Sequence, residues 1–305
     1  MDAQAIEGDV GFVGLGTMGA PMAGHLLRAL GPGRLHVTAR RRDAAADLVA
    51  SGAVWHATAR EVAAASTTVV LMVPDLPQVR QLLEGPDGLL AGAGDDLLVI
   101  VSSTSSPRGV RDLDAELRSR TASAVRVVDA PVSGGEEGAQ VGSLAIMVGG
   151  PEGDAARACA TLAPCGRPEH LGPLGAGQVA KACNQMIVAA TVTALGEASV
   201  LAERAGLDVA RLLALLGTGY AGSRILDVKA RRFAEHDHSP SGAAKFMVKD
   251  LGFATEEAAR TGTGTPQLDV LRSVFADLTD AGLGEQDTAV VQAWIGQLAR
   301  STAVA

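Results

Sequence analysis

Short apolar runs recur along the first half of the chain, and each is followed by a stretch whose apolar residues have helical spacing. Five runs span residues 9–14, 35–39, 68–73, 97–101 and 125–129, and a sixth spans residues 143–149. Alternating strands and helices are typical of βαβ units around a parallel sheet. Because the runs are apolar almost throughout, we expect strands covered by helices on both faces. This pattern predicts a doubly wound α/β domain over residues 1–172.

The pattern changes after residue 172, where helical periodicity continues toward the C-terminus. It predicts an all-α domain over residues 173–305. Its first helix, near residues 178–205, would be about 40 Å long at about 1.5 Å per residue, long enough for an interdomain helix. Between Gln185 and Gly196 this helix carries no charge, which predicts burial against the first domain or another subunit. We therefore expect a homodimer or homotetramer.

Composition and charge narrow the classes of partner. The 305 residues are 47% hydrophobic and 20% charged, enough for a full core. The net charge of −8 argues against nucleic acid, because phosphate binding needs a concentrated positive field. The uncharged stretch between Lys181 and Glu197 is too short for a membrane span, so we expect no membrane partner. The N-terminal residues MDAQAIEGDV lack a secretory pattern, which predicts a cytoplasmic protein.

Histidine and cysteine spacings give no sign of a metal site or a disulfide framework. The six histidines show no HExxH or similar spacing, and the three cysteines form no CxxC pair. We expect no bound metal and reduced thiols.

The first predicted strand leads directly into a glycine-rich turn and then a helix. The turn is Gly14-Leu15-Gly16-Thr17-Met18-Gly19. Strand, turn and helix in this order are the context of a dinucleotide fingerprint. The first glycine permits the tight turn, the second lets a pyrophosphate approach the backbone, and the third lets the helix pack on the strand. The sequence thus predicts a Rossmann-type domain for NAD or NADP, with a glycine-rich turn that binds nothing as the alternative.

The end of the second predicted strand favours NADP. It contains Ala39-Arg40-Arg41-Arg42, where an NAD enzyme would place an acidic residue against the ribose hydroxyls. The guanidinium of Arg40 can bind a 2′-phosphate. NAD is still possible, because the arginines could also form a solvated basic turn.

Ser133, Gly134 and Gly135 follow the fifth predicted strand, at the carboxyl end of the sheet where ligands bind. Their hydroxyl and unhindered N–H groups can hold a small carboxylate. An ordinary loop is the alternative interpretation.

Lys181, Asn184 and Gln185 fall at i, i+3 and i+4 of the long predicted helix and so share one face. An unpaired ammonium is costly in an apolar helix, which indicates a cleft with a polar ligand. The alternative is a lysine whose ammonium reaches solvent.

Gly177 and Lys249 are two further candidates in helical segments. Gly177 lies one turn before Lys181 and would leave room for a flat ring such as nicotinamide. Lys249 is flanked by Phe246 and Asp250, and taken alone it indicates a solvated ion pair with Asp250.

Together these motifs resemble the β-hydroxyacid dehydrogenase family, which includes 3-hydroxyisobutyrate dehydrogenase and tartronate semialdehyde reductase. Six blocks between about Gly11 and Ala293 match in order: GFVGLGTMGAPMAGHLL, MVPDLPQV, DAPVSGG, SLAIMVGG, GAGQVAKACNQ and MVKDLGFA. The resemblance implies an NAD(P)-dependent 3-hydroxyacid dehydrogenase or reductase. Hydride would pass reversibly between nicotinamide and a small carboxylate-bearing substrate, a 3-hydroxy acid or its semialdehyde, while Lys181 moves the accompanying proton.

The resemblance also assigns ligand contacts. It implies that Val73 and Pro74 line the cofactor, that Thr104 lies near the nicotinamide, and that Phe246 and Lys249 close over the cofactor. The substrate would contact Ser133, Gly134, Gly135, Asn184 and Gln185.

Two positions depart from the family pattern. Val101 stands where many relatives have an aspartate, and Gln185 replaces a common asparagine. The Asn184-Gln185 form, and the segment 221–227, resemble the tartronate semialdehyde reductase branch.

Two other functions stay open at this point. An imine reductase shares the overall fold but usually lacks a lysine at the position of Lys181. A non-catalytic cofactor-binding or interaction module would also be expected to lack it.

Overall fold

The computed structural model describes residues 5–298, which form two compact units. The boundary between the units falls between Lys181 and Ala182, inside helix α9 (Ala176–Arg204). The sequence-based boundary after residue 172 coincides instead with the end of the last strand. Each unit has a hydrophobic core of its own.

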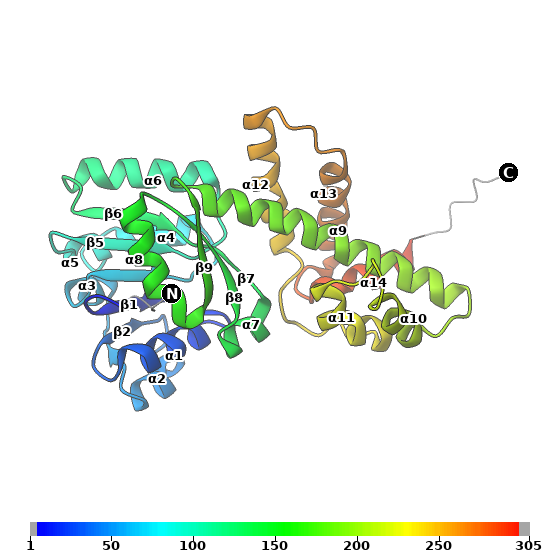
Figure 1. Ribbon diagram of the computed structural model, residues 1–305, viewed down its shortest axis with the longest axis horizontal. Helices are drawn as coiled ribbons and strands as arrows, with labels where there is room; N and C mark the ends of the chain where they lie inside the picture. Colours follow the sequence, from blue (N-terminus) through cyan, green and yellow to red (C-terminus); the bar gives the residue numbers. More distant parts are fainter. Residues whose placement is uncertain (1–4, 299–305) are drawn as a thin grey trace. The chain divides into compact units, whose positions relative to one another are not determined.

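The first unit is built on one sheet, in which nine strands are found among the described residues (Figure 1). The strands are β1 (Val10–Val13), β2 (Leu35–Thr38), β3 (Val54–Trp55), β4 (Thr68–Leu71), β5 (Leu97–Val101), β6 (Val125–Asp129), β7 (Val132–Ser133), β8 (Leu144–Gly149) and β9 (Gly166–Gly172). Their order is β3-β2-β1-β4-β5-β6-β8-β7, and β9 pairs with β8. Strands β1 to β6 are parallel, whereas β8 runs antiparallel to β6 and β7. The order 3-2-1-4-5-6 is that of dinucleotide-binding sheets, which confirms the predicted Rossmann-type class.

Helices cover both faces of this sheet because successive strand residues point to opposite sides. Phe12 belongs to a core with α1 and α8, whereas its neighbour Val13 belongs to a core with α3, α4 and α6. The helices of this unit are α1 (Gly19–Leu30), α2 (Ala46–Ala50), α3 (Ala59–Ala64), α4 (Leu76–Leu83), α5 (Leu89–Gly92), α6 (Pro107–Arg120), α7 (Gly135–Val141) and α8 (Glu152–Leu162). The doubly wound arrangement follows from these two apolar faces.

Side-chain caps start the helices that follow β4 and β5. Asp75 accepts a hydrogen bond from the Gln78 N–H at 3.0 Å at the start of α4, and Ser106 accepts one from the Gly109 N–H at 3.2 Å at the start of α6. Such caps replace the intrahelical partners that the first N–H groups lack. They fix where the loops at the carboxyl edge of the sheet end.

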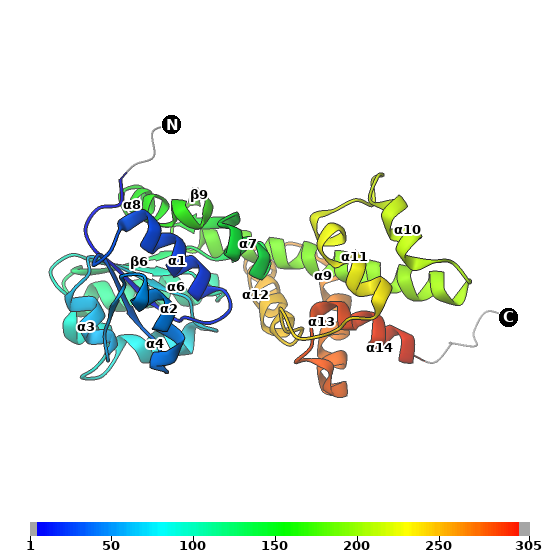
Figure 2. The same ribbon diagram turned by 90° about the horizontal axis from the view of Figure 1, so that it is seen from below.

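The second unit is helical, apart from one isolated β-bridge between Ala243 and Asp287 in the described part of the chain. Its helices gather along the C-terminal part of α9 (Figures 1 and 2). They are α10 (Val209–Leu216), α11 (Arg224–Glu235), α12 (Phe246–Thr261), α13 (Pro266–Leu278) and α14 (Val291–Gln297). Single helical turns occur at Thr279–Leu283 and Thr288–Val290 in this unit, and at Arg42–Ala45 and Ala163–Cys165 in the first unit. The predicted all-α region after the sheet is thus observed.

Helix α9 is unusually apolar for its length. By length and composition it could cross a membrane, with a mean hydropathy of 1.4, but half of that apolar window is buried inside the protein. Core helices commonly have this composition.

Candidate active site

The glycine-rich turn joins β1 to α1 in the way that its sequence predicts. Gly14 has a φ of 102°, and a Cβ there would overlap the Met72 carbonyl. A Cβ on Gly19 would overlap the Gly14 carbonyl, so this glycine permits the close packing of α1 on the strand. These two positions therefore require glycine for steric reasons.

The same turn leaves its backbone open to a ligand. Gly16 is exposed, and nothing lies within 4 Å of where its Cβ would be. Leu15 is buried, Thr17 is exposed, and the first turn of α1 contains no acidic residue. N–H groups at a helix start, without a nearby carboxylate, attract phosphate. The turn thus fits the pyrophosphate of a dinucleotide.

Arg40 lies two residues beyond β2 and is exposed, as are Arg41 and Arg42. The Nε of Arg41 lies 3.6 Å from a carboxylate oxygen of Asp43. Asp43, the acidic residue of this turn, therefore forms an ion pair with Arg41, and solvent weakens the attraction between the two exposed groups. The end of β2 presents positive charge.

The loops after β4 and β5 meet at the carboxyl edge of the sheet. Val73 and Pro74 follow β4, and the Val73 N–H donates to the Ser103 hydroxyl at 3.3 Å. Thr104 is the next residue of that second loop and is half-buried. Since β1 lies between β2 and β4, this edge is the switch point where ligands bind in such sheets.

Val101, which departs from the family pattern, ends β5 inside the core. It is fully buried and pairs in register with Leu71 and Asp129. An apolar side chain suits this position, because a carboxylate there would need a buried partner.

Ser133 is in β7, and Gly134 and Gly135 form the start of α7. Both glycines have positive φ values, 141° and 65°, which other residues rarely adopt. Glu136 and Glu137 occupy the first turn of the helix. Any carboxylate bound by this segment would therefore lie near two acidic side chains.

Asp129 is a residue of the site region that the sequence did not single out. It is completely buried at the end of β6, and its two oxygens accept hydrogen bonds from the Gly175 and Gln178 N–H groups, each at 2.7 Å. These donors belong to the start of α9. Burial raises the pKa of Asp129 to about 6, although both hydrogen bonds and the charge of Arg111 act in the opposite direction.

Gln178 makes a second connection from the first turn of α9. Its side-chain amide donates to the Ser103 carbonyl at 2.8 Å and accepts from the Ser105 N–H at 2.9 Å. The amide is buried, and the loop after β5 satisfies both its donor and its acceptor.

The interpretation of Gly177 as a residue that leaves room for nicotinamide is wrong. A Cβ on Gly177 would overlap the Met147 carbonyl and lie 2.8 Å from Asp129 Oδ2. This glycine makes room for the sheet and not for a nicotinamide ring.

Lys181 follows Gln178 by three residues on α9 and ends the first unit. Its exposed fraction is 8%. A lysine that is buried as a whole contradicts the alternative of a side chain that extends into solvent.

In the second unit, Asn184 and Gln185 join a hydrogen-bonded chain that ends on a buried carboxylate. Asn184 donates to Gln185 Oε1 at 2.9 Å, and Gln185 donates to Asp250 Oδ2 at 2.7 Å. The Lys249 ammonium donates to Asp250 Oδ1 at 2.8 Å. Asp250 is only 5% exposed, so the pair with Lys249 is not the solvated one that the sequence alone indicated.

Phe246 lies at the start of α12 and is partly exposed. The Lys249 ammonium lies 5.9 Å from the centre of its ring and 5.6 Å from the ring of Phe253. Both distances suit weak cation–π contacts. The structure thus places the Lys249 ammonium beside the Phe246 ring, and a role of both residues at the cofactor stays a prediction.

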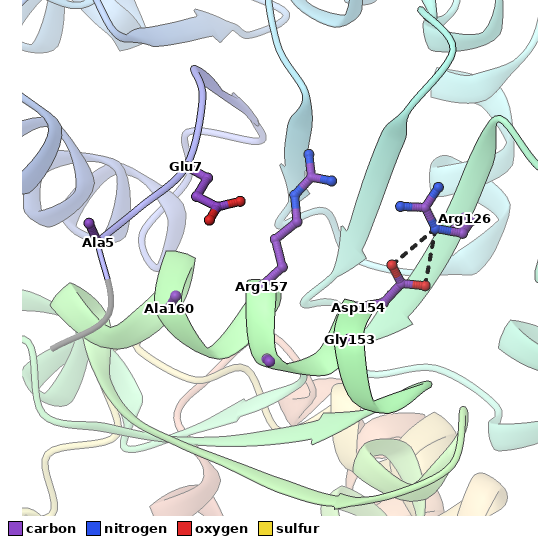
Figure 3. Close-up of a pocket in the computed structure, with 8 residues that line it drawn as sticks. Ala5, Glu7, Arg126, Gly153, Asp154, Arg157 and Ala160 are labelled. Atoms are coloured by element: carbon purple, nitrogen blue, oxygen red, sulfur yellow. Dashed lines mark hydrogen bonds and ion pairs between the residues drawn. The ribbon is translucent and has the colours of Figure 1, made fainter. Parts of the chain in front are cut away.

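A cavity of about 260 Å³ lies at the opposite, amino edge of the sheet (Figure 3). Arg126 binds Asp154 at 3.0 Å and Asp96 at 2.6 Å, and Arg157 binds Asp96 at 3.0 Å and the Thr68 hydroxyl at 2.9 Å. The Arg126 hydrogen bond holds the pKa of Asp96 below its ordinary value. Because carboxylates already occupy these guanidinium groups, the cavity offers no binding site for an anion.

Metal ligands do not cluster in the described part of the chain. Residues 5–298 contain no group of three histidine, cysteine, aspartate or glutamate side chains placed to hold a metal ion. Cys159, Cys165 and Cys183 are free thiols.

Two family profiles together match most of the chain. Residues 9–186 match the profile described as the NAD binding domain of 6-phosphogluconate dehydrogenase. Residues 175–294 match the profile described as NAD-binding of NADP-dependent 3-hydroxyisobutyrate dehydrogenase. The two matches overlap at the start of α9.

Relatives and solved structures agree with these profiles. The chain is 36% identical to 2-hydroxy-3-oxopropionate reductase of Escherichia coli, over 93% of this chain and 96% of that protein. It is also 36% identical to an NAD-dependent L-serine dehydrogenase of Pseudomonas aeruginosa, with the same coverage. The structure of a 3-hydroxyisobutyrate dehydrogenase from Salmonella typhimurium matches with a TM-score of 0.85 and 29% identity, over 94% of this chain and 100% of that chain. An imine reductase from Myxococcus stipitatus, at 15% identity and a TM-score of 0.62 over 95% and 99% of the two chains, shares the fold alone.

The glycine turn, the strand order and relatives that align over nearly the whole chain lead to one assignment. The protein belongs to the β-hydroxyacid dehydrogenase family and is an NAD(P)-dependent dehydrogenase of the 3-hydroxyacid type.

Proposed function

We propose that this enzyme transfers hydride reversibly between NADP(H) and a short 3-hydroxy acid or its semialdehyde, with Lys181 as the residue that moves the proton. The observation that carries the proposal is the burial of Lys181 near the start of α9. A buried charge is costly unless a partner or a ligand stabilises it. A reaction in which charge develops on a substrate oxygen uses such a group.

The chemistry of the named relatives supports the substrate class. They act on 2-hydroxy-3-oxopropionate, L-serine and 3-hydroxyisobutyrate, according to their names. Each compound has a carboxylate, one intervening carbon, and an alcohol or aldehyde at the next carbon. The common requirements are therefore a carboxylate anchor and a proton donor near the reacting oxygen.

We propose that Ser133, Gly134 and Gly135 supply the carboxylate anchor. A serine hydroxyl and N–H groups without side chains in front of them can surround a small anion. Glu136 and Glu137 lie in the next turn, which disfavours anions larger or more highly charged than one carboxylate. Asn184 and Gln185, on the same helix as Lys181, would bind the polar groups on the intervening carbon.

The reaction requires the protein to bind and orient the substrate and to move a proton. When bound, the nicotinamide supplies or accepts the hydride. As the carbonyl is reduced, negative charge develops on its oxygen, and the Lys181 ammonium stabilises this charge and donates a proton to it. In the reverse direction, the neutral amine accepts the proton of the hydroxyl group.

For the cofactor, Arg40 favours NADP because the end of β2 offers a guanidinium and no carboxylate. The description of the second profile names an NADP-dependent enzyme, whereas one relative is named as NAD-dependent. Val73, Pro74 and Thr104 would line the cofactor at the carboxyl edge, and Phe246 and Lys249 would close over it.

The test is the Lys181→Met variant, assayed with tartronate semialdehyde, methylmalonate semialdehyde, 3-hydroxyisobutyrate, L-serine and D-glycerate. Methionine keeps the length of the side chain and the helix propensity but removes the charge. Loss of a positioned acid–base group costs about 10²- to 10⁴-fold in kcat, while cofactor binding, followed by nicotinamide fluorescence, should survive. Arg231→Met is the control, because Arg231 pairs with Glu235 at the surface. A Lys181→Met enzyme with more than about a tenth of wild-type kcat would exclude this role.

A further inference from the structure

The carboxylate of Asp129 holds the start of α9 from outside the helix. One oxygen accepts from the Gly175 N–H and the other from the Gln178 N–H, each at 2.7 Å. The first N–H groups of a helix have no intrahelical partner, and an anion near them is favourable. Here the partner comes from strand β6, in register with Val101 of β5 and Gly149 of β8. The helix start is thus tied to the carboxyl end of a strand that lies between two others in the sheet.

Gln178 holds the same turn at a second point. Its amide group bonds the Ser103 carbonyl and the Ser105 N–H in the loop after β5. A helix attached at one point can still rotate about its axis, whereas attachment to two different elements restricts that rotation. Lys181 lies three residues after Gln178, on the same face. The hydrogen bonds of Asp129 and those of the Gln178 side chain therefore determine the direction in which Lys181 projects from α9.

Glycines close the space beside the Asp129 carboxylate on two sides. A Cβ on Gly149 would lie 2.5 Å from Asp129 Oδ1, and a Cβ on Gly177 would lie 2.8 Å from Oδ2. Two backbones thus pack directly against the carboxylate, which is fully buried. The hydrogen bonds from α9 take the place of the water that burial removes.

We propose that Asp129 is a positioning residue of the reaction, whose ionised carboxylate fixes the first turn of α9 so that Lys181 meets the substrate oxygen. The inference rests on the proposed function, because it presupposes that Lys181 moves the proton. A rotation of α9 by a few degrees would displace the lysine ammonium by about 1 Å, and misplacement of that size can cost about 10²-fold in rate.

The attachment of α9 to Asp129 depends on pH, because it depends on the charge of the carboxylate. A protonated carboxyl group has a donor on one oxygen, which would face one of the two N–H groups. Burial raises the pKa of Asp129 to about 6, so this change falls just below neutral pH. Among the charged groups of the adjoining elements, Arg111 of α6 acts on Asp129 and favours its ionised form. His170 of β9 is bound to the Gly150 and Gly172 carbonyls.

The test is the Asp129→Asn variant of the full-length enzyme, assayed from pH 5 to pH 9 on the best substrate of the panel. Asparagine keeps the shape but replaces one acceptor with a donor. We expect kcat at pH 8 to fall by about tenfold or more, with the KM for the cofactor nearly unchanged. We also expect the loss of wild-type activity near pH 6 to disappear from the profile of the variant. A purely structural role would lower Tm and leave the shape of the pH profile as it is.

Asp114→Asn is the matched control. Asp114 accepts a hydrogen bond from the Val127 N–H at 2.9 Å, two residues before Asp129 on the same strand, and its other oxygen accepts one from Arg118 of its own helix α6 at 2.6 Å. This variant should lose stability and keep both kcat and the pH profile. If it reproduces the changes of Asp129→Asn, the positioning role is excluded.

The outcomes separate the inference from the proposed function. If Lys181→Met is inactive while Asp129→Asn keeps its kcat or its acidic limb near pH 6, Asp129 does not position Lys181 and the proposed function stands. If Lys181→Met stays active, both ideas are excluded. If Asp129→Asn does not fold, Gln178→Met removes the second hold and keeps the backbone N–H. Reduced kcat with an unchanged cofactor KM in that variant supports the inference, and an unchanged kcat overturns it.

Discussion

The Gln185 amide donates to Asp250 Oδ2 at 2.7 Å, across the core of the helical unit. The other oxygen of this carboxylate accepts from the Lys249 ammonium at 2.8 Å. One buried aspartate therefore connects a residue proposed to bind the substrate with a residue proposed to bind the cofactor. Because Asp250 binds the NH₂ of Gln185, the carbonyl oxygen of that amide faces Asn184.

Asp250→Asn should destabilise the enzyme and disturb both neighbours. The asparagine NH₂ would face either the ammonium of Lys249 or the amide of Gln185, so one donor would lose its acceptor in a buried position. We expect the free energy of unfolding, measured with urea, to fall by about 1–3 kcal/mol. The KM values for cofactor and substrate should rise together.

The control for that variant is Glu235→Gln, which removes an exposed ion pair with Arg231. Exposed pairs contribute little, so the change should stay within about 0.5 kcal/mol. Equal stability of Asp250→Asn and wild type would show that Gln185 and Lys249 find other partners without cost.

The sheet could be predicted from the sequence where strands are buried on both faces. The six apolar runs correspond to β1, β2, β4, β5, β6 and β8. The other strands were not predicted: β3 and β7 have two residues each, and β9, with the sequence GRPEHLG, is mostly exposed or half-buried. Apolar periodicity cannot reveal strands that bury little apolar surface.

The candidate site was predicted only where a local motif carries the information. The glycine turn needs its residues in consecutive positions, so its geometry follows from the sequence. Asp129 carries one visible signal, a carboxylate that ends an apolar run, which implies a buried partner. The partner is the backbone of α9, 46 residues further on at Gly175, and no sequence pattern identifies it. Gly177 was misinterpreted for the same reason.

Gly177→Ala should destabilise the protein strongly. The added Cβ would overlap the Met147 carbonyl and press on Asp129 Oδ2, and both are held by the sheet. Overpacking of this kind costs about 1–3 kcal/mol or more, measured as the change in unfolding free energy. Gly153→Ala in α8 is the control, because its Cβ would meet nothing within 4 Å and alanine favours a helix by about 0.5–1 kcal/mol. Similar effects of the two substitutions would mean that the start of α9 moves freely away from the sheet.

Arg40→Asp should shift cofactor preference from NADPH toward NADH. The substitution replaces a group that attracts the 2′-phosphate with one that repels it and can accept the ribose hydroxyls. We expect the KM for NADPH to rise by about tenfold more than the KM for NADH, since a charged hydrogen bond contributes about 1.5–3 kcal/mol. Arg108→Asp changes the net charge equally at an exposed position of α6 and should leave the ratio of the two KM values unchanged. A wild-type enzyme that prefers NADH tenfold would contradict the NADP assignment.

We also propose that the enzyme is a homodimer or homotetramer that uses an exposed apolar face of α9. Ile187 and Leu201 of this helix are 66% and 70% exposed. They lie about four turns apart on one side of the helix, so a subunit interface there would remove apolar surface from water. Light scattering at micromolar concentration should give at least twice the chain mass, and Ile187→Glu combined with Leu201→Glu should reduce it. Val141→Glu, at an exposed position in α7, is the control. A monomeric wild type would exclude this arrangement.

The raised pKa of Asp129 also makes stability depend on pH in a defined direction. Its ordinary value is 3.8 and its value in the folded protein is about 6. Between these values the folded state holds a proton that the unfolded chain has released. The stability that this group contributes is therefore fully present below pH 3.8, and it is lost as the pH rises through 6.

Asp129→Asn removes this titration, so the difference in unfolding free energy between wild type and variant should change with pH. Other groups titrate in both proteins and cancel in the difference. From pH 4.5 to pH 7.5 the wild type should lose about 2 kcal/mol relative to Asp129→Asn, because one pKa unit corresponds to about 1.4 kcal/mol. Urea unfolding at five pH values measures this difference, when all curves are fitted with one common dependence of unfolding free energy on urea concentration. A difference that stays constant within about 0.5 kcal/mol, or that rises with pH, would mean that the N–H groups of α9 stabilise the carboxylate enough to offset its burial.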